Sequence, residues 1–413
     1  MGRVLLLLPT ATYRAPDFLA AAAQLGVEVV VGSERRQALA RSMGDRAVVV
    51  PLANPDAAVE AIVELHRRTP LDAVVAVDDQ GVVVAARAAE RLGLPHNPPD
   101  AVVATRDKAV MRQRLEAASV PQPEFRTVPP GGDPVAACAE IGYPCVMKPT
   151  SRAASQGVIR VDDEIQARAA AARIQALLDD CPEPLVVERF VPGAEVAVEG
   201  LLIAGELDVL AIFDKPDPLE GPYFEETIYV TPSRHPSSTL AGVEKLTAGA
   251  AEALGLREGP VHAEMRIGAT GDLTILELAA RSIGGLCSRS LRFGAGVSLE
   301  EVILRHALGL GGEGLSRETQ ASGVMMLPIR SAGILEQVSG QDEARAVDGV
   351  VGLEISIPLG REVVPLPDGD RYLGFIFARG ETADDVENAL RRAESCLDVR
   401  LRDVPIGGLA GHH

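Results

Sequence analysis

Residues 261–281 read VHAEMRIGATGDLTILELAAR. Two apolar runs, 261–267 and 273–278, flank the turn sequence ATGD, and this pattern predicts an antiparallel hairpin. Glu264 and Glu277 stand on opposite strands, so the hairpin can place them side by side. Two neighbouring carboxylates in an apolar environment repel each other unless a cation lies between them. Proteins bind Mg²⁺ through one or two carboxylates together with substrate phosphates. The hairpin therefore predicts a metal site at Glu264 and Glu277.

An arginine and a pair of glycines follow the hairpin directly. Arg281 is the next charged residue, and the segment 282–285 reads SIGG, which includes Gly284 and Gly285. A planar guanidinium can hold a carboxylate or a phosphoryl group through two parallel hydrogen bonds. Glycines allow the backbone to approach a bound ligand closely. We expect Arg281, Gly284 and Gly285 to act on the reacting groups of a substrate.

Two lysines lie in apolar sequence upstream of the hairpin. Lys108 stands in TRDK at 105–108, and Lys148 in the strand-like VMKP at 146–149. A lysine in such a strand more often faces solvent, but here the small polar segment SRAASQGV follows at 151–158. Such loops offer backbone N–H groups to phosphate oxygens, although the P-loop motif GxxxxGK[ST] is absent. The residues expected at the tip of the loop are Ser155, Gln156 and Gly157.

A further segment, 186–195, reads VVERFVPGAE. It indicates a strand that carries Glu188, a turn at Pro192-Gly193, and then Glu195. An edge backbone with a nearby carboxylate can bind the exocyclic amine of adenine, and a second carboxylate can bind ribose hydroxyls. The alternative is a surface strand whose two glutamates form salt bridges.

The order of these charged residues along the chain resembles the motifs of the ATP-grasp superfamily of carboxylate–amine ligases. It consists of two lysines, two glutamates, and then two more glutamates with an arginine. The resemblance implies two lobes that hold ATP, with two Mg²⁺ ions as the expected metal and Mn²⁺ as an alternative. Many members carry Asn at the position of Ala279 as a further metal ligand, so the number of ions stays open.

The same resemblance assigns the parts of the nucleotide. The lysines and the loop bind the phosphates, Glu188 and the backbone of 190–191 contact adenine, and Glu195 contacts ribose. The ATP-binding residues that it implies are Lys108, Lys148, Ser155, Gln156, Gly157, Glu188, Phe190, Val191 and Glu195.

The segment 214–232, DKPDPLEGPYFEETIYVTP, is similar to an insertion in bacterial L-amino acid α-ligases, a dipeptide-forming group. In that group an acid and a residue three positions later line the amino-acid pocket. The positions that match are Glu226 and Tyr229. A carboxylate suits the ammonium of an amino acid, while the alternative is an ordinary acidic loop.

Short apolar runs alternate with helical patterns over the first hundred residues, which predicts a Rossmann-like parallel sheet covered by helices. The predicted strands are 4–8, 27–31, 47–50 and 73–77, and the predicted helices are 18–25, 55–68 and 81–92. No Gly-rich turn follows the first strand, so no dinucleotide fingerprint is present. The pair Asp78-Asp79 follows a predicted strand and could reach a ligand there, but the favoured interpretation is a solvated turn that caps the next helix. Glu199, Glu206 and His262 are interpreted as packing or supporting residues.

The expected class is α/β, an ATP-grasp fold in four parts. These are an N-terminal α/β domain at 1–100, a small lobe at 101–185, a central lobe with the metal and substrate site at 186–310, and a C-terminal α/β domain at 311–413. In the last part, strands are predicted at 324–329, 351–357 and 372–378 and a helix at 383–396.

Composition excludes several classes of protein. A formal charge of -18 argues against a nucleic-acid partner, because binding to phosphate backbones needs clustered Lys and Arg. The 5 cysteines form no CxxC pair, so neither a zinc site nor a disulfide framework is expected, and a reducing cytoplasm fits best. No apolar run approaches the roughly 20 residues that span a bilayer.

The resemblance implies ATP-dependent formation of a C–N bond through an acyl phosphate. The expected partners are a small-molecule carboxylate and amine, both amino acids in the simplest case, and a homodimer is expected by analogy alone. Three alternatives stay open: a ligase for another carboxylate or a specialised-metabolite amine, a biotin-carboxylase-like enzyme that uses bicarbonate, and a nucleotide-binding protein without turnover.

Overall fold

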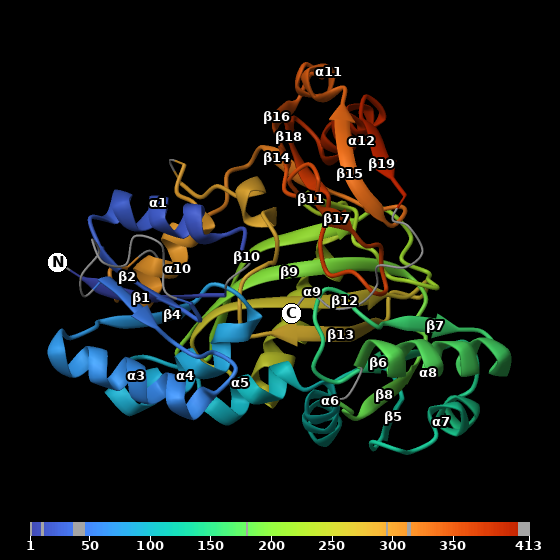
Figure 1. The fold of residues 1–413 in the computed structure, drawn as a ribbon, viewed down its shortest axis with the longest axis horizontal. Coiled ribbons are helices and arrows are strands. Elements are labelled where there is room, and N and C mark those ends of the chain that lie inside the picture. Colours follow the sequence, from blue (N-terminus) through green and yellow to red (C-terminus); the bar gives the residue numbers. More distant parts are fainter. Residues whose placement is uncertain are drawn as a thin grey trace. The chain divides into compact units, whose positions relative to one another are not determined.

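The computed structural model describes residues 2–9, 12–35, 46–178, 181–294, 296–311 and 315–403 (Figure 1). By their internal contacts they form two units. The first comprises Met1–Gln122, Val196–Ile212 and His235–Glu318, and the second comprises Pro123–Glu195, Phe213–Arg234 and Thr319–His413. Each unit is mixed α/β, which confirms the predicted class.

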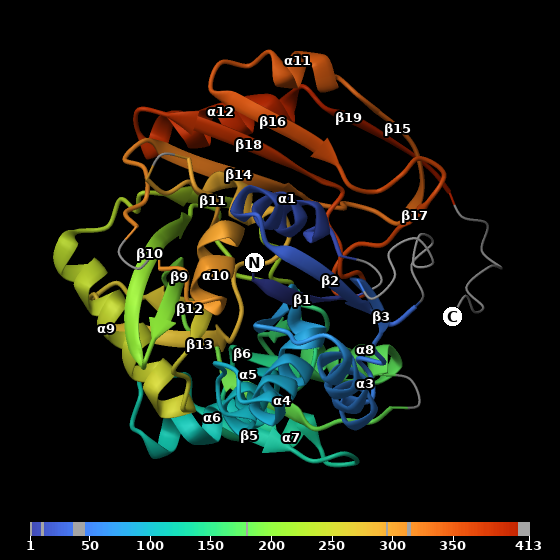
Figure 2. The ribbon, with the colours of Figure 1, turned by 90° about the vertical axis from the view of Figure 1, so that its left-hand side faces the viewer.

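A parallel sheet opens the first unit, in the strand order β3-β2-β1-β4. Its strands are β1 (Arg3–Leu8), β2 (Glu28–Ser33), β3 (Ala47–Val49) and β4 (Ala73–Ala76). Its helices are α1 (Ala15–Leu25), α3 (Pro55–Arg68) and α4 (Val82–Leu92). In two perpendicular views, α1 lies on one face of the sheet and α3 and α4 on the other (Figure 1, Figure 2). The predicted alternation of strands and helices is confirmed. Most of these strand residues are apolar, as is typical of a parallel sheet covered by helices.

Two short helices lead out of this sheet. They are α5 (Pro99–Arg106) and α6 (Lys108–Ala117). Asp107 separates them and caps α6, since its carboxylate accepts hydrogen bonds from the N–H groups of Ala109 and Val110. This cap fixes Lys108 as the first residue of α6, where its side chain is buried.

The first unit also holds most of an antiparallel meander, in the strand order β13-β12-β9-β10. Its strands are β9 (Ala194–Ile203), β10 (Glu206–Lys215), β12 (Gly259–Ile267) and β13 (Leu273–Ala279). The helices α9 (Ser237–Leu254) and α10 (Leu299–Ala307) belong to the same unit, with the short η2 (Asp79–Gly81) and η3 (Cys287–Ser290). One apolar cluster joins α5, α6 and α9 to β9, β12 and β13, so the hairpin rests on a continuous core.

The second unit begins with an antiparallel sheet in the order β5-β8-β6-β7. The strands are β5 (Phe125–Val128), β6 (Cys145–Pro149), β7 (Ile159–Val161) and β8 (Leu185–Arg189), and the helices are α7 (Pro134–Ile141) and α8 (Glu164–Leu178). Apolar residues of both helices form one core with the sheet. Lys148 and Glu188 are thereby held on the neighbouring strands β6 and β8.

The rest of the second unit is a C-terminal layer. Its main strands run in the order β11-β14-β18-β16, and a small sheet runs β17-β15-β19. The elements are β11 (Ile228–Thr231), β14 (Ala321–Leu327), β15 (Gly333–Ser339), α11 (Gln341–Arg345), β16 (Val350–Ile355), β17 (Glu362–Val363), β18 (Gly374–Gly380), α12 (Ala383–Ser395) and β19 (Asp398–Arg402). The predicted strands and helix of this region are confirmed within a few residues at their ends. No helix among the described residues is long and apolar enough to cross a membrane.

Candidate functional site

The two glutamates of the hairpin are direct cross-strand partners. Glu264 on β12 pairs with Glu277 on β13, and the register shifts immediately after Glu264. Their side chains are 24% and 32% exposed, so both are partly withdrawn from water. Residues that face each other on an antiparallel pair have their Cβ atoms about 5 Å apart. The predicted juxtaposition of two carboxylates is confirmed.

Protein cations stand beside both carboxylates. The Nζ of Lys108 lies 3.7 Å from Oε2 of Glu277. The Nε2 of His262 lies 3.4 Å from Oε1 of Glu264. The mutual repulsion of the two glutamates is therefore offset by one cation from α6 and by an imidazole two positions along β12.

His262 itself rests on Glu199, which is completely buried on β9. The His262 Nδ1 lies 3.1 Å from Oε2 of Glu199. Burial alone would lower the pKa of His262, but the hydrogen bonds to Glu199 and Glu264 outweigh it and raise that pKa to about 9. The imidazolium form is thus shared by two glutamates, one buried and one in the hairpin site.

Glu199 makes a second contact, which the interpretation of this residue as an ordinary packing residue did not predict. Its two carboxylate oxygens accept the backbone N–H of Ile283 at 3.0 and 2.9 Å. The sequence contained a signal, since Glu199 interrupts the apolar run of β9, and a charge in such a run needs a partner. The buried carboxylate ties β9 both to His262 and to the segment after Arg281.

Arg281 is held by Asp79. Its Nε lies 2.9 Å from Oδ2 of Asp79, and Arg106 NH1 lies 2.9 Å from Oδ1 of the same carboxylate. Burial would raise the pKa of Asp79, but Arg281 and Arg106 outweigh it and hold that pKa below its ordinary value. Burial likewise opposes the charge on Arg281, whose pKa is nevertheless raised by Asp79. The interpretation of Asp78-Asp79 as a solvated turn is wrong for Asp79, because a turn at the end of a parallel strand brings it to two guanidinium groups.

The segment after Arg281 is fixed by a buried arginine as well. Arg14, only 1% exposed, donates to Oγ of Ser282 at 2.8 Å and to the carbonyl of Val77 at 3.0 Å. Beyond this anchor the backbone is open: a Cβ added at Gly284 would meet no atom within 4 Å. Gly285 has φ +59°, a conformation that favours glycine. Arg14 therefore anchors the segment after Arg281, and Gly284 leaves room for a ligand.

In the second unit, Lys148 and Glu188 form a buried ion pair. The Nζ of Lys148 lies 2.7 Å from Oε2 of Glu188, and both side chains are less than 10% exposed. The two residues come from the neighbouring strands β6 and β8, which are paired in register. A buried charge is tolerated when it is paired and hydrogen-bonded. The family resemblance assigns both residues to the nucleotide, and their contact with each other was not predicted.

The loop after Lys148 is tied to a C-terminal segment of the same unit. The N–H of Gly157 donates to the carbonyl of Pro367 at 3.1 Å, and Nε2 of Gln156 donates to the carbonyl of Asp368 at 3.0 Å. Ser155 and Gly157 have φ of +56° and +72°. The tip of the loop therefore has the turned backbone expected of an anion-binding loop, with these two donors directed to carbonyl groups.

An aromatic surface follows Glu188. The ring of Phe190 lies 6.4 Å from that of Phe224, centroid to centroid, and the guanidinium of Arg160 lies 4.2 Å above Phe190. Val191 is partly exposed beside it. Aromatic faces with a stacked guanidinium suit a flat heterocycle such as adenine.

Glu195 and Glu226 both contact Lys215, which the sequence did not predict as a site residue. The Nζ of Lys215 lies 2.7 Å from Oε1 of Glu195 and 2.8 Å from Oε1 of Glu226. It also lies 5.0 Å from the centre of the Tyr229 ring. Lys215 ends the apolar strand β10 and is 2% exposed, so a buried partner for it could have been sought among the nearby acids. The structure thus joins Glu195, Glu226 and Tyr229 around one buried cation.

Family profiles match three parts of the chain. The ATP-grasp N-terminal domain matches residues 19–96, the ATP-grasp domain matches 141–290, and the L-amino acid ligase C-terminal domain 2 matches 325–402.

Curated relatives agree with this domain content. Alanine–anticapsin ligase of Bacillus subtilis is 29% identical over 266 residues, which are 60% of this chain and 56% of that protein. Carnosine synthase 1 of Gallus gallus is 30% identical over 293 residues, 65% of this chain and 31% of that protein. The chain therefore spans about half the length of the alanine–anticapsin ligase that it matches.

Solved structures show the same fold. The L-amino acid ligase from Bacillus licheniformis superposes with a TM-score of 0.81 at 24% identity, covering 98% of this chain and 99% of that one. A carboxyaminoimidazole ribonucleotide synthase from Aspergillus clavatus, complexed with ATP, gives a TM-score of 0.75 at 17% identity, covering 96% and 98%. Its matching domains, relatives and fold agree: the chain carries ATP-grasp domains and an L-amino acid ligase C-terminal domain, and it is similar to the bacterial L-amino acid ligases.

Proposed function

We propose that the protein joins the carboxylate of one amino acid to the amine of a second, using ATP and releasing ADP and phosphate. The observation that carries the proposal is the cross-strand pair Glu264–Glu277, with Lys108 at 3.7 Å from Glu277 and Arg281 two residues beyond β13. A pair of carboxylates beside a lysine and an arginine matches the needs of phosphoryl transfer, in which charge must be spread and held in place. The amino-acid substrates are inferred from the matching C-terminal domain of L-amino acid ligases.

The carboxylate pair fits a magnesium ion. Carboxylate oxygens are the ligands that Mg²⁺ prefers, and the two glutamates face each other from adjacent strands. Ala279 at the end of β13 offers no side-chain oxygen, so Glu264 and Glu277 are the metal ligands that we propose on this hairpin. When bound, the metal would neutralise phosphate oxygens, a contribution worth several kcal/mol in comparable enzymes.

The chemistry would proceed in two displacements. An oxygen of the first substrate's carboxylate attacks the γ-phosphorus of ATP, the bond from that phosphorus to the bridging oxygen breaks, and ADP leaves. The amine nitrogen of the second substrate then attacks the carbonyl carbon of the acyl phosphate, the bond to the phosphate oxygen breaks, and the nitrogen loses a proton. Lys108 and Lys148 offset charge on the phosphoryl group, while Arg281 and the backbone of Gly284-Gly285 stabilise the oxyanion.

The nucleotide would be bound by the residues that the family resemblance assigns in the second unit. Phosphates are assigned to Lys148 and the 155–157 loop, adenine to Glu188 and the backbone of 190–191, and ribose to Glu195. Lys148 is already paired with Glu188, and Glu195 with Lys215. These pairs keep buried charges compensated without a ligand. Nucleotide binding would therefore replace a contact between two side chains by a contact with the nucleotide, and no phosphate would meet an isolated charge.

The first amino acid would be held through its ammonium group by Glu226, beside Tyr229. Glu226 shares one oxygen with Lys215 at 2.8 Å. A carboxylate has about four lone-pair positions on its two oxygens, so it can accept from a substrate ammonium and from Lys215 together. Tyr229 is buried, and its ring lies 5.7 Å from that of Phe213, centroid to centroid, which holds the ring in place beside Glu226.

A screen of phosphate release tests this function. The protein, Mg²⁺ and ATP are combined with single amino acids and with pairs, and products are identified by mass spectrometry. Release that needs two amino acids, together with a dipeptide product, supports the proposal. Release with bicarbonate alone would indicate a carboxylase. Release only with a non-amino-acid carboxylate or another amine would indicate a different ligase, and the absence of release with every substrate would indicate a nucleotide-binding protein.

A further inference from the structure

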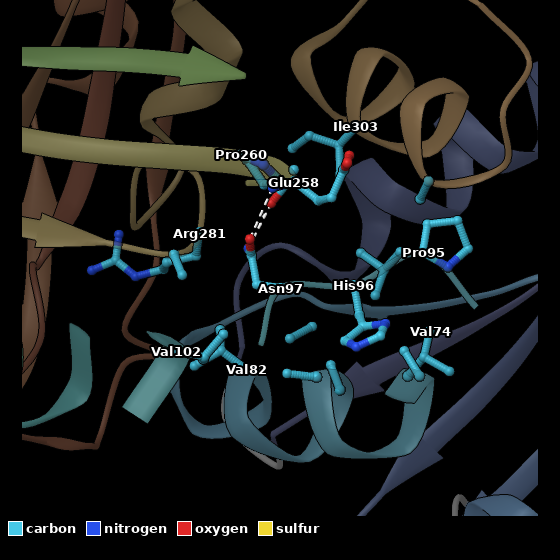
Figure 3. A pocket seen from close by; sticks show the side chains of 18 of the residues that line it. Val74, Val82, Pro95, His96, Asn97, Val102, Glu258, Pro260, Arg281 and Ile303 are labelled. Carbon is cyan, nitrogen blue, oxygen red and sulfur yellow. Dashed lines mark hydrogen bonds between the residues drawn. The ribbon is translucent and has the colours of Figure 1, made fainter. Parts of the chain in front are cut away.

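A cavity of about 120 Å³ lies in the first unit among β4, α4, α10 and the segments 95–97 and 258–260 (Figure 3). Small side chains account for the space, because a side chain that ends at Cβ leaves a volume that a larger one would fill. The alanines that line it are Ala76, Ala85, Ala86, Ala89, Ala280 and Ala307. Val74, Val82, Val102 and Ile303 complete walls that are apolar over most of their area.

The rim of the cavity is fixed by hydrogen bonds. Asn97 Nδ2 donates to the carbonyl of Glu258 at 2.6 Å, and its Oδ1 accepts from the N–H groups of Arg257 and Glu258 at 2.7 and 2.8 Å (Figure 3). The N–H of Gly259 donates to Nε2 of His306 at 3.1 Å. The rim is thus built before any ligand binds, as in most small-molecule sites.

Two imidazoles supply the polar end. The Nδ1 of His96 lies 2.8 Å from the carbonyl of Leu94. A carbonyl only accepts, so Nδ1 carries the proton and Nε2 of the neutral ring is an acceptor. The Nε2 of His306, which accepts from the N–H of Gly259, also lies 3.3 Å from Oε2 of Glu258, so this nitrogen is engaged within the rim. The lining therefore offers the Nε2 acceptor of His96 on a mostly apolar surface, which suits a ligand with a single hydroxyl or similar donor group.

The same walls lead to the arginine of the candidate site. Ala280 and Arg281 line the cavity with their backbone, while the guanidinium of Arg281 points away from it (Figure 3). The opposite wall contains Val74, Val75 and Ala76 of β4, the strand that leads to Asp79. Arg281 and Asp79 are joined at 2.9 Å. An occupant of the cavity therefore contacts the backbone that supports each partner of this ion pair.

We propose that this cavity is a regulatory site for a small, mostly apolar molecule with one hydroxyl-like group, and that its occupancy changes how firmly Arg281 is held. The volume of the cavity limits the size of the ligand, since an engineered apolar cavity of roughly 150 Å³ binds benzene. The ligand class is therefore a molecule of about the size of one six-membered ring. Coupling between the cavity and Arg281 is reciprocal, so a substrate that engages Arg281 changes the affinity of the cavity ligand by the same factor.

Phenol and benzene are suitable probes, applied to the whole chain without ATP or amino acids. Phenol should raise the thermal midpoint by about 2 °C at ten times its dissociation constant and slow hydrogen exchange in the segment 277–285. Benzene, which lacks the hydroxyl, should bind several-fold more weakly. Ala307→Leu should abolish both effects by filling the cavity from its half-exposed edge, whereas Ala57→Leu, at an exposed position of α3, should leave both unchanged.

Unchanged phenol binding in Ala307→Leu, or phenol binding without any change of exchange in 277–285, would overturn the proposal. If Ala307→Leu does not fold, Ala307→Val removes less volume and must still weaken phenol binding. Because these measurements need no turnover, they remain decisive if the ligase activity proposed above is not found. Where activity is found, phenol should alter the KM for the carboxylate substrate in the natural sequence and not in Ala307→Leu.

Discussion

At the scale of single residues, the first unit couples its candidate site to largely buried groups. Glu264 and Glu277 are balanced by His262 and Lys108, and Arg281 by Asp79. None of these pairs is a surface salt bridge of the kind that contributes little, because each has at least one partner withdrawn from water. Removing His262, Lys108 or Asp79 leaves a partner uncompensated and partly withdrawn from water, so these substitutions should have effects well above those of ordinary surface changes. Neutralising Glu277 differs, because it also relieves the repulsion between Glu277 and Glu264.

The substitution Glu277→Gln should abolish phosphate release, with a decrease of about 10³-fold or more, because the amide cannot neutralise a metal. The thermal midpoint should change little, since Gln has the same shape and the site is partly exposed. Glu206→Gln, at the exposed start of β10, is the matched control and should retain full activity. Near-normal phosphate release by Glu277→Gln would remove this residue from the metal site.

The pH dependence of stability should reveal the imidazolium of His262. Its pKa of about 9 in the folded protein exceeds the unfolded value of about 6.5. The stabilisation is therefore fully present below pH 6.5 and is lost as the pH rises through 9. In metal-free buffer with EDTA, the free energy of unfolding should exceed that of His262→Gln by at most about 3 kcal/mol at pH 6, and the difference should shrink toward pH 9.5. A difference that stays constant between pH 6 and pH 9.5 in urea unfolding would contradict the assignment.

At the scale of elements, local patterns predict strands and helices well, but close contacts between elements escape them. Gly323 in β14 is an example: a Cβ there would lie 2.7 Å from the carbonyl of Tyr229 on β11 and 2.8 Å from Val386 on α12. The absence of a side chain at this position is what allows α12 to lie against the sheet beside β11. The sequence gives no sign of this, because Gly323 sits in an apolar run that predicts a strand with or without it.

Gly323→Ala should therefore lower the free energy of unfolding by about 1–3 kcal/mol, since overpacking forces backbone shifts. The measurement is urea unfolding followed by circular dichroism. Gly249→Ala, inside α9 with no atom within 4 Å of the new Cβ, is the matched control and should stabilise by about 0.5–1 kcal/mol. Equal effects of the two substitutions would show that the packing against Tyr229 and Val386 does not constrain β14.

At the scale of the whole molecule, the residues proposed for the nucleotide are distributed over both units. Lys108 belongs to the first and Lys148 to the second. The chain has 58 Asp and Glu against 40 Lys and Arg, a net charge of -18, so an anionic ligand must depend on locally placed cations and on a metal.

A non-hydrolysable ATP analogue with Mg²⁺ should raise the thermal midpoint, and EDTA should abolish the increase, because the metal offsets the phosphate charge. Lys108→Met and Lys148→Met should each remove most of the increase, although the two lysines lie in different units. Lys245→Met, at an exposed position of α9, is the matched control. An undiminished increase in either site variant would exclude that lysine from the nucleotide site.

The sequence by itself determined the elements and the hairpin. Apolar periodicity is a local property, so the parallel sheet of the first hundred residues, and three strands and the longer helix of the last ninety, followed from it. The pairing of Glu264 with Glu277 followed too, because a short turn fixes which residues of a hairpin face each other.

Only the tertiary structure decided the partners of the charged residues. Asp79 and Arg281 are about two hundred positions apart, as the numbering shows, and Glu199 reaches Ile283 from another strand. Lys215 stands at the end of an apolar run, but that it would contact Glu195 and Glu226 together did not follow from the local pattern. The physical reason is that a buried charge requires a partner but does not specify which one. That choice is made by how the strands and helices pack, which no local run of residues contains.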